Sequence, residues 1–238
     1  MMERTHIDRE YEDDLRRLRV QLIMMGGRVE ALISSSIRAF TERDAELAHR
    51  SVESDCAVEQ HQIAIDCLCR RVLTLRRPEA SDLRFVTSSL TLATDLERIA
   101  DLGVSISRCV LDLCVEAPLQ PEVGLPRMAT EVEFMLHESV DAFVTSDASK
   151  AERVLARGQL VDNLSAQAFC ESLTHVVENS QCITQALRLQ SVVKYVERIA
   201  DHVSNLCKMV VLMVGGKDAC PAVNAGDSMR AVPNHKTN

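Results

Sequence analysis

Apolar side chains recur along much of this chain at intervals of three and four residues, which is the spacing of an amphipathic helix. One such seam consists of Leu92, Leu96, Ile99, Gly103, Ile106, Val110 and Leu113. A second seam repeats this spacing 100 residues later, at Val192, Val196, Ile199, Val203, Leu206, Val210 and Met213. Each seam forms one apolar stripe along a long helix, and that stripe must pack against neighbouring helices.

The same periodicity predicts helices over most of the chain, at about residues 7–42, 44–76, 79–115, 125–145, 147–177 and 180–214. A segment rich in proline and glycine separates the third helix from the fourth. We therefore predict a first domain at 1–117, a linker at 118–126, a second domain at 127–217 and a disordered tail at 218–238. Three long helices with short connections in each half predict antiparallel bundles.

The two halves are related by an internal repeat. Residues 97–101 and 197–201 both read Glu-Arg-Ile-Ala-Asp. A second match, at an offset of 103, aligns two copies of Ala-Phe-x-x-x-Asp-Ala, which contain Asp44 and Asp147. We expect these aspartates to be the N-caps of the second and fifth helices, because their side chains can accept first-turn N–H groups. The predicted fold class is all-α, with two tandem three-helix bundles.

Composition narrows the possible functions. Aromatic residues make up only 3% of the chain and there is no Trp, which favours helices over sheets. The net charge of -8 argues against binding to a nucleic-acid backbone. Nine cysteines occur without a CxxC motif, and the N-terminus has no apolar signal segment, so free thiols in a reducing cytoplasm are expected. No apolar stretch approaches the roughly 18 residues that a membrane span needs.

Paired carboxylates are the candidate functional residues of this chain. Glu97 and Asp101 are four residues apart, as are Glu197 and Asp201, so each pair projects side by side from its helix. The apolar seams place both pairs on the outer surface of their bundles. Like charges at this spacing repel each other, and a bound cation would remove that repulsion.

A hard cation needs further oxygen ligands, and the second helix offers Asp55 and Glu59, also four residues apart. The equivalent residues of the second repeat are Gly158 and Asp162, so one carboxylate is lost there. His202, next to Asp201, could add an imidazole ligand.

The alternative interpretation is an ordinary solvated helix surface. On that interpretation Arg98 would pair with Asp101, and Arg198 with Asp201, at a spacing of three residues. The occurrence of the acidic pairs at matched positions in both repeats gives the metal interpretation the same weight as the solvated surface, and the pattern alone leaves both open.

Several segments together resemble the PhoU family. They are Met25-Gly26-Gly27, residues 42–48, Pro78, residues 81–84, residues 93–101, residues 195–202, Asn205 and residues 214–217. The resemblance covers about residues 5–217. It implies a pair of three-helix bundles that carries metal ions on its surface and is often dimeric. It also implies a cytoplasmic protein that acts with the phosphate ABC transporter and its ATPase, and with the phosphate-sensing histidine kinase. Such a protein keeps phosphate uptake and the starvation response low when phosphate is plentiful, and associates with the membrane only through its partners.

By this resemblance, the divalent or trivalent metal ions (Mg, Mn, Fe or Zn) would be held by Glu97, Asp101, Glu197, Asp201, Asp55, Glu59 and Asp162. Three positions depart from the family pattern. Gly158 replaces an expected acid, so a weaker or a mononuclear second site is expected. Leu102 and Ser105 stand where the family often has His or Tyr and Asn, so the first site has fewer auxiliary ligands.

Three other functions are compatible with parts of this pattern. A metal-buffering helical protein would share the carboxylates but would place them inside the bundle, and the Glu-x-x-His motif of di-iron bundles is absent from the third and sixth helices. A metal-dependent phosphatase would need a nucleophile elbow, a P-loop or a His-rich centre, and none is found, so we expect no enzyme. A metal-binding helical adaptor without a role in phosphate signalling remains open.

Overall fold

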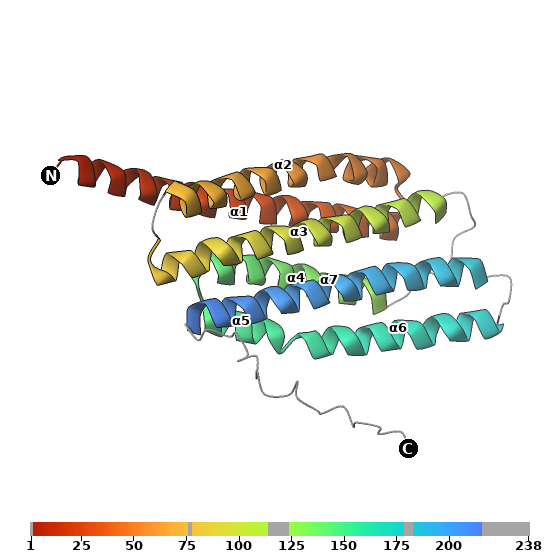
Figure 1. Cartoon of the computed structure of the whole chain (residues 1–238). Coiled ribbons are helices and arrows are strands. Elements are labelled where there is room, and N and C mark those ends of the chain that lie inside the picture. Colours follow the sequence, from red (N-terminus) through yellow and green to blue (C-terminus); the bar gives the residue numbers. More distant parts are fainter. Residues whose placement is uncertain (1, 76–77, 114–123, 179–182, 216–238) are drawn as a thin grey trace, which may run out of the picture.

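The structure is a computed structural model that describes residues 2–75, 78–113, 124–178 and 183–215. Every regular element in these residues is a helix, which confirms the predicted all-α class (Figure 1). The helices are α1 (Met2–Glu42), α2 (Ala45–Leu75), α3 (Ala80–Leu113), α4 (Gly124–Thr145), α5 (Ala148–Leu155), α6 (Gly158–Glu178) and α7 (Ile183–Gly215). None of the described helices is both long and apolar enough to cross a membrane.

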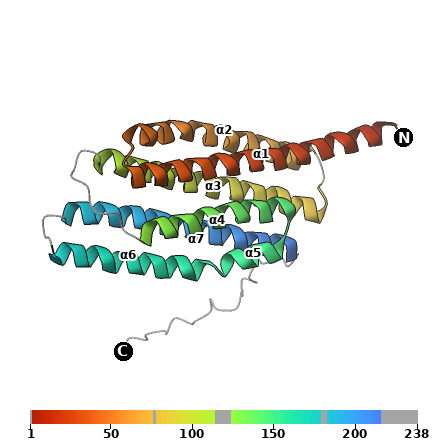
Figure 2. The ribbon, with the colours of Figure 1, turned by 180° about the vertical axis from the view of Figure 1, so that it is seen from behind.

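Two bundles lie side by side, as Figures 1 and 2 show from opposite directions. The first bundle comprises α1, α2 and α3, and the second comprises α4 to α7. They meet where α3 packs against α7 and α1 against α4, so α2 and α6 lie on the two outer sides. Cross-contacts show that α3 and α7 are antiparallel, since Arg84 of α3 binds the carbonyl of Met213 (3.2 Å) and Asp95 binds His202 (3.3 Å).

Most residues of the two apolar seams are buried in one continuous hydrophobic cluster that includes residues of α1 to α7, whereas Val110 packs in a smaller cluster with Ala39, Leu47 and Ala48. Gly103 allows α1 to approach α3 closely, because a Cβ atom there would clash with Leu32 Cδ2. Beside it, the buried Ser107 hydroxyl donates to the Ser36 hydroxyl at 2.8 Å. Across the bundles, the rings of Phe85 and Phe143 lie 5.5 Å apart between centroids.

Matched turns end the first helix of each repeat. Arg43 and Ser146 both have φ of 55°, the left-handed conformation that commonly closes a helix. The next residue caps the following helix, because Asp44 Oδ1 accepts from the Leu47 N–H, and Asp147 Oδ1 from the Lys150 N–H, each at 2.9 Å. Both predicted N-caps are thus confirmed.

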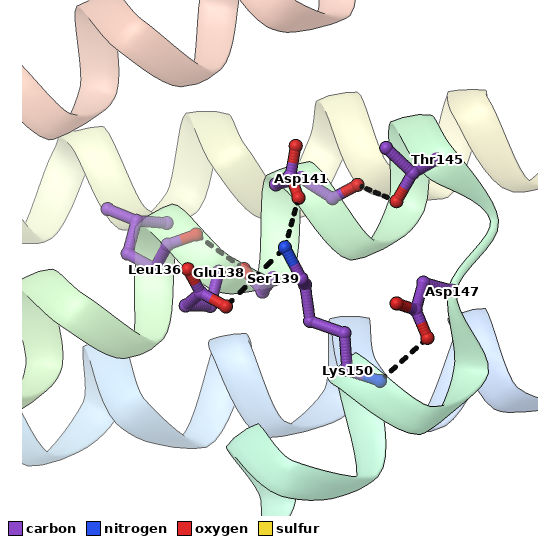
Figure 3. A network of polar contacts seen from close by, with 7 residues as sticks. All are labelled: Leu136, Glu138, Ser139, Asp141, Thr145, Asp147 and Lys150. Carbon is purple, nitrogen blue, oxygen red and sulfur yellow. Dashed lines mark hydrogen bonds and ion pairs between the residues drawn. The ribbon is translucent and has the colours of Figure 1, made fainter.

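The cap at Asp147 belongs to a polar network that ties α5 to α4, shown in Figure 3. While the Lys150 N–H binds Asp147, its ammonium pairs with Asp141 and lies 3.6 Å from Glu138, both on α4. The short helix α5 is therefore held at its first turn by a capping bond and by ion pairs to its neighbour.

The predicted single helix at 147–177 is wrong, because the chain breaks between α5 and α6. Arg157 N–H binds the Val154 carbonyl, and Leu160 N–H binds the Arg157 carbonyl, so the helix tightens to a three-residue spacing there. Arg157 holds this turn against α4, with two hydrogen bonds to Glu131 and its guanidinium 4.2 Å from the centre of the Phe134 ring. The periodicity of apolar residues within one segment does not predict such contacts between helices.

The remaining boundaries agree with the prediction to within a few residues, except at the N-terminus, where α1 begins at Met2. Helix α4 begins at Gly124, inside the predicted linker 118–126, and the rest of that linker lies outside the described residues. The predicted disordered tail at 218–238 also lies outside them.

Candidate functional site

The first candidate site lies on the outer face between α2 and α3. Asp55 and Glu59 come from α2, and Glu97 and Asp101 from α3. Asp55 and Glu97 are half-buried, whereas Glu59 and Asp101 are exposed. The apolar seams turn inward and leave these four carboxylates on the outward faces of α2 and α3, which pack against each other.

The four carboxylates lie close enough to repel one another across α2 and α3. Partial burial, followed by repulsion from Asp101 and Glu59, raises the pKa of Asp55, although Arg108 opposes the change. Partial burial also raises the pKa of Glu97, followed by repulsion from Asp101 and Asp55, although the charge of Arg98 opposes the change. Each half-buried carboxylate is thus less stable when ionised than it would be in water.

The arginine expected to neutralise this face turns elsewhere. Arg98 lies 3.7 Å from Asp95, one turn earlier on α3, rather than pairing with Asp101. Within the described part of the chain, no Lys or Arg side chain lies within 4.0 Å of the four clustered carboxylates. By contrast, Asp66, further along α2, is paired with Arg70. The ordinary interpretation, in which each acid has an arginine partner, therefore fits Asp66 better than the cluster.

The donor set of this face suits a hard cation, which prefers several oxygen ligands and tolerates carboxylates from different helices. No group of three or more His, Cys, Asp or Glu side chains among the described residues converges closely enough to hold an ion as placed. Binding an ion here would therefore require rotation of these side chains. The ion would supply positive charge that cancels the mutual repulsion of the cluster.

The second candidate site lies between α6 and α7 and is built differently. Asp162 and Asp201 are exposed, and Glu197 is half-buried. The Ser165 hydroxyl donates to Glu197 Oε2 at 2.6 Å, and the Lys194 ammonium binds Oε1. Both oxygens of this carboxylate are thus bonded to neighbouring side chains.

These bonds reverse the electrostatic situation found at Glu97. Partial burial alone would raise the pKa of Glu197, but the hydrogen bonds from Lys194 and Ser165 and the charge of Lys194 outweigh it and lower the pKa. The site opens into a groove of about 640 Å³, lined by Asp162, Ser165, Ala166, Phe169, Cys170, Gln190, Val193, Lys194 and Glu197.

His202, which could have served as an imidazole ligand beside Asp201, is directed to the interface between the bundles. Its Nδ1 lies 3.3 Å from Asp95 of α3. Leu102, the equivalent residue of the first repeat, is buried in the core. The first site therefore has no imidazole at this position, and the second has one that is bonded to the opposite bundle.

Two residues of the second site were missed from the sequence. Lys194 and Ser165 decide the environment of Glu197, yet neither is an acid or a histidine. The repeat carried a signal for one of them, since Lys194 aligns with the neutral Thr94 at the offset of 100 residues. The hydrogen bond from Ser165 joins two helices and had no such signal.

Comparison with known proteins identifies the family of this chain. A family model described as the PhoU domain matches the chain twice, over residues 22–110 and 125–210. The chain belongs to the PhoU family. One PhoU domain runs from the middle of α1 to α3 and the other from α4 to α7, so the family resemblance and the tandem repeat are both confirmed.

PhoU relatives match over most of their length. The phosphate-specific transport system accessory proteins PhoU of Serratia marcescens and of Escherichia coli (strain K12) are each 32% identical to this chain over 213 residues, covering 90% of it and 88% of the relative. The crystal structure of PhoU from Pseudomonas aeruginosa aligns with a TM-score of 0.82 at 32% identity, covering 87% of this chain and 99% of that one. The phosphate transport system regulatory protein PhoU from Streptococcus pneumoniae aligns with a TM-score of 0.80 at 28% identity, covering 87% and 98%.

Proposed function

We propose that this protein is a regulatory accessory protein of a phosphate-specific transport system, and that it keeps phosphate uptake and the starvation response low when phosphate is plentiful. The observation that carries the proposal is the pair of PhoU domains, with relatives of that name matching 90% of the chain. The relative from Streptococcus pneumoniae is itself named a regulatory protein of phosphate transport.

The proposed mechanism is that of a scaffold rather than an enzyme. In the cytoplasm the protein, as a homodimer, would dock on the transporter ATPase and on the phosphate-sensing histidine kinase, and would transmit the state of one to the other. Such coupling requires that the protein bind two states of a partner with different affinity. Long helices packed on one continuous core support this role, because they hold the outer surfaces in a fixed relation.

The acidic face of the first bundle is the proposed metal site. Asp55, Glu59, Glu97 and Asp101 would hold a divalent or trivalent ion, and the ion would outweigh the repulsion between them that Arg98 and Arg108 oppose only in part. Neutralising them would link α2 to α3 and stiffen that face. A metal-storage function is less well supported, because Glu59 and Asp101 are exposed on the outer surface rather than enclosed in the bundle.

Pull-downs with the purified transporter ATPase and the kinase from the same organism test the proposal. The wild-type chain is expected to retain both partners, and failure to bind either one contradicts the scaffold mechanism. The metal role is tested by repeating the experiment with the double variant Asp55→Asn/Glu97→Gln, with and without EDTA. Asp66→Asn is the matched control, since Asp66 lies on the same helix but is paired with Arg70.

A further inference from the structure

The two repeats differ at the positions that surround their matched acidic pairs. On α3, Glu97 and Asp101 are preceded by the neutral Thr94, whereas on α7 the equivalent residue before Glu197 is Lys194. On the facing helix, the first repeat has Asp55 where the second has Gly158 at the offset of 103. The second repeat has therefore lost one negative charge and gained one positive charge at the same face.

The positive charge gained at Lys194 is paired with Glu197 of the same site. Lys194 and Glu197 are three residues apart on α7, close enough for the ammonium to bind Oε1 of the carboxylate. Ser165 of α6 donates to the other oxygen at 2.6 Å. A cation approaching Glu197 would be repelled by the ammonium of Lys194 and would compete with it and with the Ser165 hydroxyl for the carboxylate oxygens.

The backbone around Gly158, which stands in place of the missing carboxylate, has room for a Cβ atom. A Cβ atom added to Gly158 would have Ser204 Oγ as its nearest neighbour, at 3.6 Å, which is ordinary van der Waals contact. A Cβ atom at this position is therefore sterically acceptable. The absence of a carboxylate here is a difference in chemistry rather than a consequence of packing.

We propose that metal binding by this protein is confined to the first bundle, and that the ammonium of Lys194 takes the place of the cation in the second. This inference rests on the proposed metal role of the α2–α3 face. The two faces are then unequal: the charge of the α2–α3 face changes when metal binds, whereas at the α6–α7 face the charge of Glu197 is already neutralised by the Lys194 side chain.

Titration of the full chain with Mn²⁺ after treatment with EDTA, followed by electron paramagnetic resonance of the free ion, tests the inference. Asp55→Asn/Glu97→Gln is expected to weaken binding by at least the roughly 10–100-fold typical of disturbing a metal site's outer shell. Glu197→Gln is expected to leave the binding curve unchanged. A fall in the number of bound ions in Glu197→Gln would overturn the inference.

A gain of binding provides the second arm. Gly158→Asp/Lys194→Thr copies Asp55 and Thr94 of the first repeat into the second, and it is expected to bind additional Mn²⁺. Gly158→Asp/Lys194→Arg adds the same carboxylate but keeps a cation beside Glu197, and no additional ion is expected. Circular dichroism confirms that each variant is folded.

The loss-of-binding and gain-of-binding experiments together distinguish a failure of this inference from a failure of the proposed metal role of the first bundle. If the wild-type chain binds no Mn²⁺ but Gly158→Asp/Lys194→Thr does, the metal role of the first bundle is wrong and the role of Lys194 is supported. If Gly158→Asp/Lys194→Thr binds no more Mn²⁺ than the wild type, Lys194 and Gly158 are not what excludes metal, and the inference is overturned.

Discussion

Two glutamates at matched positions, Glu97 and Glu197, show how a few neighbouring side chains set the chemistry of a helix surface. Both are half-buried and both begin the same five-residue sequence. Burial and repulsion raise the pKa of Glu97, whereas bonds from Lys194 and Ser165 lower that of Glu197. The same motif can therefore present a charge that favours binding a cation or one that is already balanced.

The raised pKa of Asp55 predicts that this residue destabilises the metal-free fold. Because the folded protein holds a proton on Asp55 more tightly than the unfolded chain does, the ionised form reduces stability above the raised pKa. Asp55→Asn should therefore raise the melting temperature in EDTA at pH 7. Removing two like-charge contacts of a few tenths of a kcal/mol each predicts a rise of about 1–3 °C.

The pH dependence of this gain tests its electrostatic cause. The advantage of Asp55→Asn should shrink as pH falls through the raised pKa, and should disappear below the pKa of an aspartate in the unfolded chain, where Asp55 is neutral in both states. The control Asp66→Asn removes an attractive pair with Arg70 and should give no gain. A lower melting temperature for Asp55→Asn than for wild type at pH 7 would contradict the account.

The sequence located the carboxylates but not their environment. Glu97, Asp101, Glu197 and Asp201 could be found because each pair recurs at a fixed offset, and helical spacing places both members on one face. Which acid has a partner depends on rotamers and on neighbouring helices. Thus Arg98 turns to Asp95 rather than to Asp101, and Ser165 reaches Glu197 from another helix.

At the scale of the helices, close packing depends on small residues within the apolar seams. In α3, Gly103 occupies a seam position where a Cβ would clash with Leu32 Cδ2 and lie 2.8 Å from Ile33 Cδ1, both on α1. The seam pattern treats Gly103 as equivalent to Val203 of the second repeat, although the two positions tolerate different side chains.

Gly103→Ala is expected to destabilise the protein by about 1–3 kcal/mol, because the added methyl group overpacks the contact between α1 and α3. Gly27→Ala is the control: this exposed glycine of α1 has no atom within 4 Å of a Cβ, so alanine should stabilise the helix by about 0.5–1 kcal/mol. Urea denaturation measures both. Equal effects of the two substitutions would show that helix propensity, rather than packing, decides the outcome.

Helix existence could be read from periodicity, whereas one internal break could not. The caps at Asp44 and Asp147 follow from local chemistry and were predictable. The break between α5 and α6 is held by Arg157, whose partners Glu131 and Phe134 lie more than 20 residues earlier on α4. Contacts of that kind depend on the assembled bundle, and no pattern within 147–177 indicates them.

At the scale of the whole molecule, the two repeats share one hydrophobic cluster that runs through the contact between α3 and α7. Neither bundle therefore has a core of its own that ends at the boundary. We expect the two PhoU domains to unfold together rather than in sequence.

Two natural probes can test this cooperativity. The chain has two tyrosines and no tryptophan; Tyr11 lies on α1 and Tyr195 on α7. In the variant Tyr195→Phe the remaining tyrosine is Tyr11, so its fluorescence reports on the first bundle. In Tyr11→Phe the remaining tyrosine is Tyr195, so its fluorescence reports on the second bundle. Each signal should change at the same urea concentration as the circular dichroism of the same variant. A fluorescence transition displaced from the circular dichroism transition would contradict a shared core.

Regulation of the phosphate response is the central claim, and alkaline phosphatase activity in cells grown at high phosphate tests it most directly. In a strain that carries no other PhoU gene, deletion of this gene should raise the activity, and the wild-type gene should restore it to a low level. Activity that stays low after deletion would contradict a role in restraining the phosphate response.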